Sequence, residues 1–408
     1  MEKNKKVALC FLLVGLLTLA LGFATPVEAK NEKKEIMIGA AIPLTGGGAT
    51  MGKEMEFAYQ AVVDDWNKKG GVFVKEYGKK LPLRIVFYDT ETASGKSSAG
   101  VERLIKVDKA DFLLGGLGSA LGVIPGAITA EKYKKLYHSS MCTFGSWEKH
   151  NFKYSTLMFY SLFEAAAGHY EIWNSLPEAK RPKRPALIVE DTFDGRSVAV
   201  PVRKNAESHG YKFVLDTSFP VGGKDYSPQI IKAKSMGVDA LVMHGPTADL
   251  VTFTRQMKEN DFSVPYHFSY RAFLSGTLPK LLGKDHNYLL SAGHWFGSYP
   301  YPGCKELDER FYKEFKKHSV IIGPLYTLGQ TLFRAIELAG TLESLKVRQA
   351  LIDNEFDGTV MGKIDYNEAG KAKYVCAIFQ WWEGLGHPVW PFDVTDYKLK
   401  LAPAWQAR

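Results

Sequence analysis

The feature that most constrains this fold is a regular alternation of short apolar runs with longer amphipathic segments. The run 36–42 predicts a buried strand, and 51–68 predicts a helix because its apolar residues recur at helical spacing and end at Gly70-Gly71. Such alternation is typical of parallel sheets covered by helices on both faces. Two series, separated near 154–185, therefore predict an α/β fold with two doubly wound parallel-sheet lobes. The predicted strands are 36–42, 83–88, 111–114, 136–140, 186–189, 213–216, 240–243, 265–268 and 374–382, and the predicted helices are 51–68, 100–107, 121–133, 196–208, 228–234, 250–258, 323–339 and 347–352.

Residues 1–29 have the pattern of an export signal. A basic start containing Lys3, Lys5 and Lys6 precedes the apolar run 7–23, and small residues surround a cleavage site after Ala29. An uncleaved membrane anchor is the alternative, because the run is nearly long enough to span a bilayer. We expect a signal peptide at 1–29 and a soluble mature protein in the periplasm.

Composition excludes several classes of protein. Apolar residues make up 46% and charged residues 24% of the chain, which are ordinary globular values. The net charge of +8 comes from Lys and Arg scattered among acidic residues, so no nucleic-acid partner is predicted. Beyond the signal the cysteines are Cys142, Cys304 and Cys376. This odd number leaves at least one thiol unpaired and gives no disulfide framework.

Loops rich in glycine and hydroxyl residues follow several predicted strands, at 45–50, 115–119 and 139–143. Ligands of open parallel sheets bind at this edge, where helix N-termini attract anions. The segment 116–122 resembles a dinucleotide fingerprint, but it follows the third strand and lacks the expected acidic residue. We predict that Ser119 and Thr143 hold a small carboxylate. The alternatives are a tight turn without ligand at Ser119 and a helix N-cap at Thr143.

No catalytic constellation is visible. Glu190, Asp191 and Asp194 cluster after a predicted strand, and two carboxylates there could do acid/base chemistry. A helix N-cap and polar ligand contacts are the favoured interpretations, so no enzyme activity, cofactor or metal is predicted. Aromatic residues in the same loops favour a flat apolar ligand; they are Phe144, Trp147, Phe193, Tyr270 and Trp295.

Six segments, in order and spacing, carry a family resemblance. They are Ile38-Gly39-Ala40-Ala41-Ile42-Pro43-Leu44-Thr45-Gly46, Gly52-Lys53-Glu54, Asp64-Asp65-Trp66-Asn67-Lys68-Lys69-Gly70-Gly71-Val72, Val86-Phe87-Tyr88-Asp89-Thr90, the loop 115–119 and Lys224-Asp225-Tyr226-Ser227-Pro228. The chain resembles the periplasmic solute-binding proteins of branched-chain-amino-acid ABC transporters, of the Leu/Ile/Val-binding type. The resemblance covers essentially the whole mature chain.

The resemblance implies two lobes joined by three crossovers, with the ligand held in the cleft between them. Residues 30–156 and 297–373 would form the first lobe, and 157–296 with 374–408 the second. Ser119 and Thr143 match the hydroxyl residues that hold the ligand carboxylate, and Met141 would supply a backbone carbonyl. The resemblance also implies a membrane permease as partner, and we expect a monomer.

Four positions depart from the pattern that the resemblance leads us to expect. Met51 stands where an aromatic residue usually covers the ligand, Asp194 where a Tyr-Gly pair is common, and Thr247 at a further aromatic position. Arg271 stands at the place of the acidic residue that pairs with the ligand ammonium. Phe193, beside Asp194, is also expected at the ligand.

A cation at Arg271 would repel an ammonium by a few kcal/mol in a closed cleft, at an effective dielectric near 20. We therefore hypothesise an aromatic or short-chain carboxylate as ligand in place of a plain branched-chain amino acid. Alternatively, Asp191 or Asp194 receives an ammonium and Arg271 points to solvent.

The predicted function is capture of a small carboxylate-bearing solute and its delivery to an ABC transporter. A ligand-sensing receptor of the same fold is the first alternative. An exported amide or acyl hydrolase that uses the carboxylates near Glu190 is the remote one.

Overall fold

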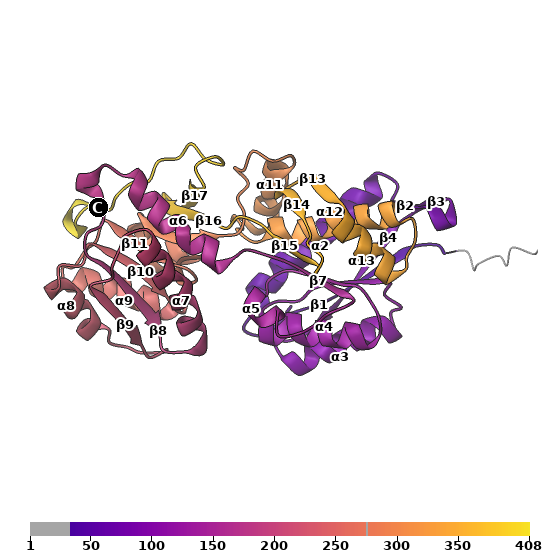
Figure 1. Cartoon of the computed structure of the whole chain (residues 1–408), viewed down its shortest axis with the longest axis horizontal. Coiled ribbons are helices and arrows are strands. Elements are labelled where there is room, and N and C mark those ends of the chain that lie inside the picture. Colours follow the sequence, from indigo (N-terminus) through magenta and orange to yellow (C-terminus); the bar gives the residue numbers. More distant parts are fainter. Residues whose placement is uncertain (1–32, 275) are drawn as a thin grey trace, which may run out of the picture.

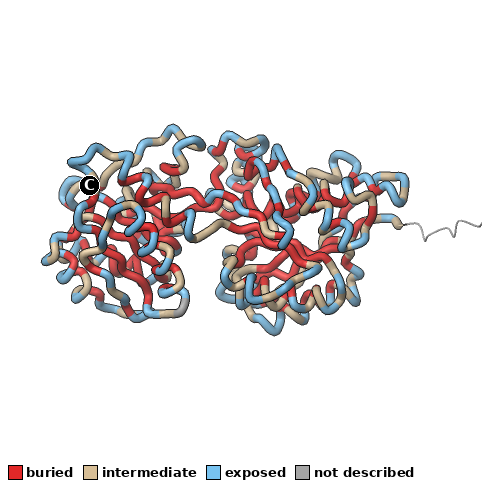
Figure 2. Tube along the Cα trace, in the orientation of Figure 1, coloured by how far each residue is buried: buried red, intermediate tan, exposed pale blue. Residues whose placement is uncertain are grey.

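The computed structural model describes residues 33–274 and 276–408, so the predicted signal peptide lies outside the described residues. These residues form two lobes joined by a narrower connection (Figure 1), and each lobe is built on its own large sheet. Figure 2 shows that buried chain fills the interior of both lobes. The predicted α/β fold with two parallel-sheet lobes is therefore confirmed.

The sheet of the first lobe has the order β15-β7-β6-β5-β1-β4, and all its neighbouring strands are parallel. Its strands are β1 (Ile36–Ile42), β4 (Leu83–Asp89), β5 (Phe112–Leu114), β6 (Tyr137–Ser139), β7 (Ser155–Phe159) and β15 (Lys371–Lys373). The central strand β1 is almost wholly buried, as a strand covered by helices on both faces must be.

The sheet of the second lobe has the order β17-β16-β12-β11-β10-β8-β9. It is parallel except for β16, which runs antiparallel to both β12 and β17. Its strands are β8 (Pro185–Glu190), β9 (Leu215–Phe219), β10 (Ala240–His244), β11 (Tyr266–Ser269), β12 (Leu289–Gly293), β16 (Ala377–Trp382) and β17 (Leu385–Trp390). Two small hairpins, β2 (Val72–Val74) with β3 (Lys79–Leu81) and β13 (Glu355–Thr359) with β14 (Gly362–Asp365), lie outside the large sheets.

Helices connect the strands and cover both sheets (Figure 1). The first lobe contains α2 (Ala49–Lys68), α3 (Ser94–Lys106), η2 (Ser119–Val123), α4 (Ile124–Lys132), α5 (Phe144–Trp147), α11 (Cys304–Phe315), α12 (Ile322–Ala339) and α13 (Ser344–Asp353). The second contains α6 (Leu162–Ser175), α7 (Phe193–Ser208), α8 (Ser227–Ser235), α9 (Thr247–Glu259) and α10 (Leu278–Leu282). Short 3-10 turns are η1 (Lys75–Tyr77), η3 (Glu178–Lys180), η4 (Ala272–Leu274), η5 (Gly283–His286) and η6 (Trp405–Ala407).

Within the described residues the chain passes between the two sheets after β7, after β12 and after β15. Because β7 and β12 are parallel to their neighbours and leave from their carboxyl ends, both sheets turn their carboxyl edges toward the connection. This geometry decides where a ligand site can lie. The predicted lobe boundaries stay predictions, and β7, which pairs in the first sheet, runs past the boundary at 156.

The local predictions fail where tertiary packing decides. The segment 154–185, expected as a break, contains both β7 and α6. The edge strand β9 lies at Leu215–Phe219, later than predicted, because Leu215 and Phe219 are the residues that point into the core. The strand β12 was not predicted, and its short sequence, Leu-Leu-Ser-Ala-Gly, has no periodicity to mark it.

Two apolar clusters form the core. Alternate residues of β8 contribute to different clusters, with Ala186 and Ile188 in one and Leu187 and Val189 in the other, as expected for a strand covered on both faces. Cys142, Cys304 and Cys376 are all buried and free. No helix in the described part of the chain is long and apolar enough to cross a membrane.

We predict that Gly52→Ala destabilises the protein. A Cβ atom at Gly52, on α2, would lie 1.8 Å from the carbonyl oxygen of Pro43. We expect a loss of about 1–3 kcal/mol in the free energy of unfolding, measured by urea denaturation. At the matched control Gly47→Ala a Cβ meets nothing within 4 Å, so equal losses for both variants would contradict the packing.

Buried histidines predict a stability that falls with acidification. Burial lowers the pKa of His138, His169 and His267 to about 3 and that of His294 to about 4. Below a pH of about 6.5 the unfolded chain binds protons at these sites while the folded protein does not.

We therefore expect the free energy of unfolding to fall from pH 6.5 toward pH 5, by as much as about 1.4 kcal/mol per pH unit for each such histidine. His318 acts in the opposite direction, because its hydrogen bond to Asp308 raises its pKa. The four buried histidines outnumber it, so their effect decides the sign. Urea denaturation at a series of pH values measures the slope. A flat profile would show that these histidines are protonated alike in both states.

Candidate functional site

The hydroxyl pair predicted for a ligand carboxylate lies at the carboxyl edge of the first sheet. Ser119 follows β5 and opens η2, and Thr143 follows β6 and immediately precedes α5. The backbone N–H of Thr143 donates to Ser119 Oγ at 3.1 Å, and Thr143 Oγ1 donates to Ser146 Oγ at 3.0 Å. The structure thus brings Ser119 and Thr143 together, while Thr143 sits at the N-cap position without a side-chain capping bond.

Two buried tyrosines hold the glycine loop that leads to Ser119. Tyr59 donates from its hydroxyl to the carbonyl of Gly115 at 2.8 Å, and the Tyr137 hydroxyl accepts from the N–H of Gly116 at 2.8 Å. Gly118 has a φ of 77°, which a residue with a side chain seldom adopts. Gly118 is therefore required by the path of the loop.

The neighbouring loop after β1 is fixed by a carboxylate. Asp89 Oδ1 accepts from the N–H groups of Leu44 and Thr45 at 2.9 and 3.1 Å, and Asp89 Oδ2 accepts from Thr45 Oγ1 at 2.6 Å. Burial acts to raise the pKa of Asp89, but these hydrogen bonds outweigh it and lower that pKa. Met51 follows on α2, partly buried against the core, and its place over the ligand stays a prediction.

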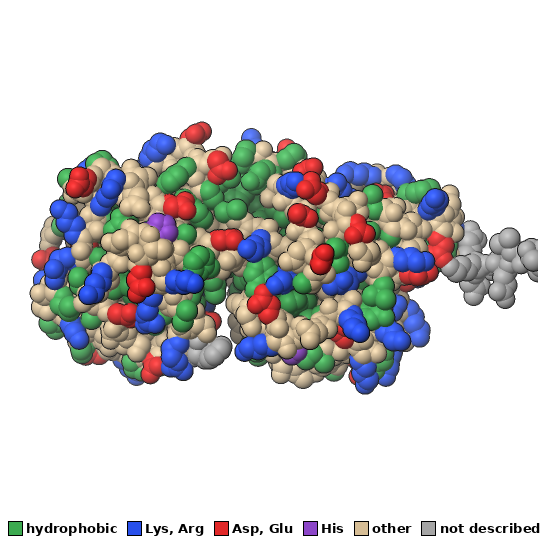
Figure 3. Space-filling model, in the orientation of Figure 1, with side chains coloured by type: hydrophobic (Ala, Val, Ile, Leu, Met, Phe, Trp, Pro, Cys, Tyr) green, Lys and Arg blue, Asp and Glu red, His purple; other side chains and the backbone are tan. Residues whose placement is uncertain are grey.

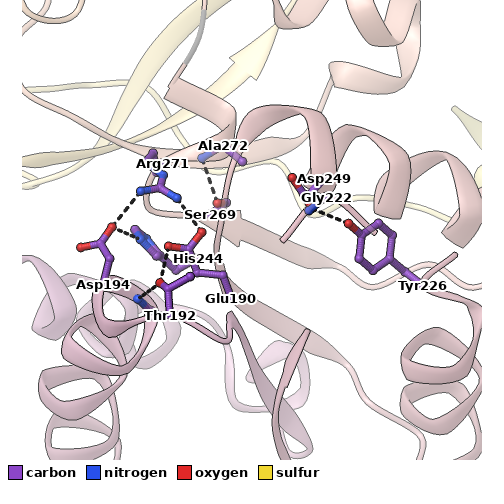
Figure 4. A network of polar contacts seen from close by, with 11 residues as sticks. Glu190, Thr192, Asp194, Gly222, Tyr226, His244, Asp249, Ser269, Arg271 and Ala272 are labelled. Atoms are coloured by element: carbon purple, nitrogen blue, oxygen red, sulfur yellow. Dashed lines mark hydrogen bonds and ion pairs between the residues drawn. The ribbon is translucent and has the colours of Figure 1, made fainter. Parts of the chain in front are cut away.

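A charged group lies at the carboxyl edge of the second sheet (Figure 4). Glu190 ends β8, His244 ends β10, Asp194 lies in the first turn of α7, and Arg271 follows β11. Arg271 Nη2 donates to Glu190 Oε2 at 2.6 Å, and Arg271 Nη1 donates to Asp194 Oδ2 at 2.8 Å. His244 Nε2 lies 3.0 Å from the same oxygen of Asp194.

Burial divides this group into a buried and an accessible part. The side chain of Glu190 is 3% exposed, whereas those of Arg271 and Asp194 are 44% and 51% exposed. A buried carboxylate needs a partner, which Arg271 provides together with Thr192, whose Oγ1 donates to Glu190 Oε1 at 2.8 Å. The hydrogen bond with His244 lowers the pKa of Asp194, burial opposes it, and the charge of Arg271 adds to the lowering. With two carboxylates on one guanidinium, Arg271 presents no unbalanced positive charge.

The remaining predicted residues have separate roles. Asp191 is exposed and paired with Arg196, Nη1 to Oδ1 at 2.7 Å. Thr247 opens α9, and its hydroxyl donates to the carbonyl of Ala272 at 3.0 Å, which ties it to the loop that carries Arg271. Phe193 is the first residue of α7. Met141, buried in the loop before Thr143, has a φ of 57°.

The charged group has the donor types of a metal site. One atom from each of Glu190, Asp194 and His244 lies within 4.8 Å of the others. Both carboxylates already bind the guanidinium of Arg271, so a divalent cation would have to displace it. The arrangement is better suited to hydrogen bonding and to charge recognition than to metal binding.

The hydroxyl pair of the first lobe and the charged group of the second lobe face the same space. Figure 3 shows the surface hollowed between the lobes, and in the view of Figure 1 this hollow lies between α5 and α7. Thr143 precedes the first of these helices and Asp194 lies in the first turn of the second. Two parallel α/β lobes joined by three crossing segments, with polar groups on facing carboxyl edges, define a two-lobed ligand-binding protein.

Known proteins support this class. The chain belongs to the periplasmic binding protein family, which matches residues 35–384. It is 24% identical over 365 residues to Leu/Ile/Val-binding protein homolog 1 of Brucella suis, covering 86% of this chain and 91% of that protein.

Solved structures show the same fold. The branched-chain amino acid transporter substrate-binding protein LivJ of Streptococcus pneumoniae, in complex with isoleucine, matches with a TM-score of 0.71 and 16% identity over 86% of this chain and 98% of that one. The ABC transporter substrate-binding protein of Desulfitobacterium hafniense in complex with Leu matches with a TM-score of 0.71 and 18% identity, covering 87% and 100%. The predicted resemblance, and solute binding in place of catalysis, are confirmed.

Sequence reasoning missed part of the charged group. The predictions for Glu190 are an acid or base, a helix N-cap or a polar ligand contact, and His244 is not among the predicted site residues. Both are the last residues of parallel strands, and that position is the signal that could have found them. The contacts of Glu190 with Arg271 and of His244 with Asp194 depend on the strand order, which places β11 beside β10 and β10 beside β8.

We predict that the pKa of Asp194 depends on His244. In the wild-type protein it should lie below the ordinary value, because the hydrogen bond with His244 stabilises the carboxylate. His244→Ala should raise it, as measured by carboxyl ¹³C NMR across pH 2–6. A pKa that does not move in this variant would show that the hydrogen bond is absent in solution.

Proposed function

We propose that this chain captures a small carboxylate-bearing solute between its lobes in the periplasm and delivers it to the membrane permease of an ABC transporter. The observation that carries the proposal is the meeting of Ser119 and Thr143 at the edge that faces the second lobe. Hydroxyl and N–H donors at helix starts suit an anionic oxygen. A solute that bridges both lobes favours the closed form through its greater affinity for that form.

The carboxylate is the part of the ligand with the clearest partners. Charge-assisted hydrogen bonds contribute roughly 1.5–3 kcal/mol each. Two or three of them account for much of the roughly 8 kcal/mol behind a micromolar dissociation constant. Ser119, Thr143 and the carbonyl of Met141 would hold this end of the solute, with Met51 and Phe193 near its remaining surface.

Two classes of solute suit the charged group of the second lobe. An aromatic or short-chain carboxylate without an amine is favoured by Arg271, whose side chain is 44% exposed. An amino acid is favoured by the excess of carboxylate over guanidinium, because the half-exposed Asp194 can receive an ammonium. The neutralisation of Arg271 by Glu190 removes most of the repulsion on which the first hypothesis rested. Amino acids are also the ligands named for the LivJ and Desulfitobacterium structures.

A thermal-shift screen of ligand-stripped protein distinguishes these classes. The panel contains leucine, isoleucine and phenylalanine, the amine-free isobutyrate and benzoate, and urea as a neutral control. A ligand at a hundred times its Kd stabilises the folded state by about 2.7 kcal/mol, which shifts Tm by a few degrees. A shift with the amine-free acids shows that binding needs no ammonium, which favours the first class of solute. A shift with amino acids alone assigns the ammonium to Asp194, and no shift with any carboxylate contradicts the proposal.

We predict that Ser119→Ala and Thr143→Val weaken binding of whichever carboxylate the screen identifies. Each should raise Kd by about 10- to 100-fold, the loss of one charge-assisted hydrogen bond, measured by isothermal titration calorimetry. Ser235→Ala, at an exposed position on α8, is the matched control. Unchanged affinity in both site variants would place the carboxylate elsewhere.

A further inference from the structure

The three segments that join the lobes carry a cluster of rings. Tyr160 follows β7, His294 follows β12, Tyr374 follows β15, and Phe159 ends β7. We call these four residues the hinge ring cluster. The ring centroid of Tyr160 lies 4.5 Å from that of Phe159, 5.1 Å from that of His294 and 6.2 Å from that of Tyr374. His294 Nδ1 lies 2.7 Å from the Tyr374 hydroxyl.

Strand register places this cluster between the two polar groups of the site. In the first sheet Ser139 is level with Leu157, so Met141 falls level with Phe159 when the register is continued. In the second sheet Ser269 is level with Ser291, which brings Arg271 level with the end of β12, just before His294. The cluster therefore lies at the carboxyl edges of both sheets, at the base of the space between the lobes.

Tyr160 differs from the other three rings in its exposure. Phe159, His294 and Tyr374 are each at most 7% exposed, whereas Tyr160 is only partly buried. Its ring packs against those of Phe159, His294 and Tyr374, and part of its surface stays exposed. Burial, followed by charge on Cys376 and Asp194, raises the pKa of the Tyr160 phenol well above its ordinary value, in keeping with a position near the charged group.

We propose that Tyr160 forms the floor of the solute site and contacts a planar, π-bearing part of the solute. It would be a specificity-determining residue for aromatic carboxylates or aromatic amino acids. A ring supported by other rings loses little freedom when a second ring stacks on it. Because Tyr160 lies in a joining segment, it moves little when the lobes close, so it contacts the solute before and after closure. This inference rests on the proposed function and adds the class of side group that the solute carries.

Two pairs of probes compare a planar aromatic ring with its saturated, non-planar counterpart. Benzoate is compared with cyclohexanecarboxylate, and phenylalanine with cyclohexylalanine, by isothermal titration calorimetry. In the wild-type protein the aromatic member of a bound pair should have a Kd about two- to tenfold lower. Tyr160→Leu should remove that preference, and Tyr160→Phe should keep it. Tyr312→Leu, at an exposed ring on α11, is the matched control.

Each outcome has a distinct meaning. Wild-type protein that binds none of the four probes but binds an aliphatic carboxylate of the thermal-shift panel overturns this inference and leaves the proposed function standing. Protein that binds no carboxylate of either panel overturns both. Wild-type protein that binds both members of a pair equally overturns the role of Tyr160 alone, even if Tyr160→Leu fails to fold. Equal losses for both members in a folded Tyr160→Leu variant show a structural role and also overturn it. If Tyr160→Leu loses the aromatic preference while Tyr160→Phe and Tyr312→Leu keep it, Tyr160 contacts the ring of the solute as proposed.

Discussion

The carboxyl edges of the two sheets face each other, and the rest of the molecule depends on this constraint. It follows from chain direction, because β7 and β12 leave their sheets at their carboxyl ends to enter the other lobe. The loops that follow the parallel strands therefore lie beside the space between the lobes. Ser119, Thr143, Asp194 and Arg271 come from different strands in different lobes, yet topology alone directs them to one region.

The charged group shows how burial changes the meaning of a residue. Arg271 looked like a cation aimed at the ligand, but the buried Glu190 requires it as a counter-ion. A guanidinium has enough donors to bind Glu190 and Asp194 together and still present N–H groups to solvent. Arg271 can therefore be structural toward the core and functional toward the solute.

Much of the fold could be predicted from the sequence because parallel strands buried on both faces are continuous apolar runs, such as 36–42 and 240–243. The hydroxyl pair was also predictable, since glycine-rich loops after such runs mark the ligand edge. The contacts within the charged group and the hinge ring cluster could not be predicted. The partners of Arg271 depend on strand order, and Tyr160, His294 and Tyr374 meet only because three distant crossings lie side by side. No local sequence pattern indicates the strand order or the meeting of the three crossings.

Neither sheet is built from one continuous stretch of chain. The first needs β15, which comes after the whole second lobe, and the second needs β16 and β17. The tail beyond them is also anchored, since the Gln380 side chain bonds the backbone of Lys400 and Trp405 Nε1 donates to the carbonyl of Phe262. Pairings this distant in sequence form slowly. A chain emerging from its N-terminus would thus complete neither lobe until nearly all of it had appeared, so both lobes reach their final form together and late.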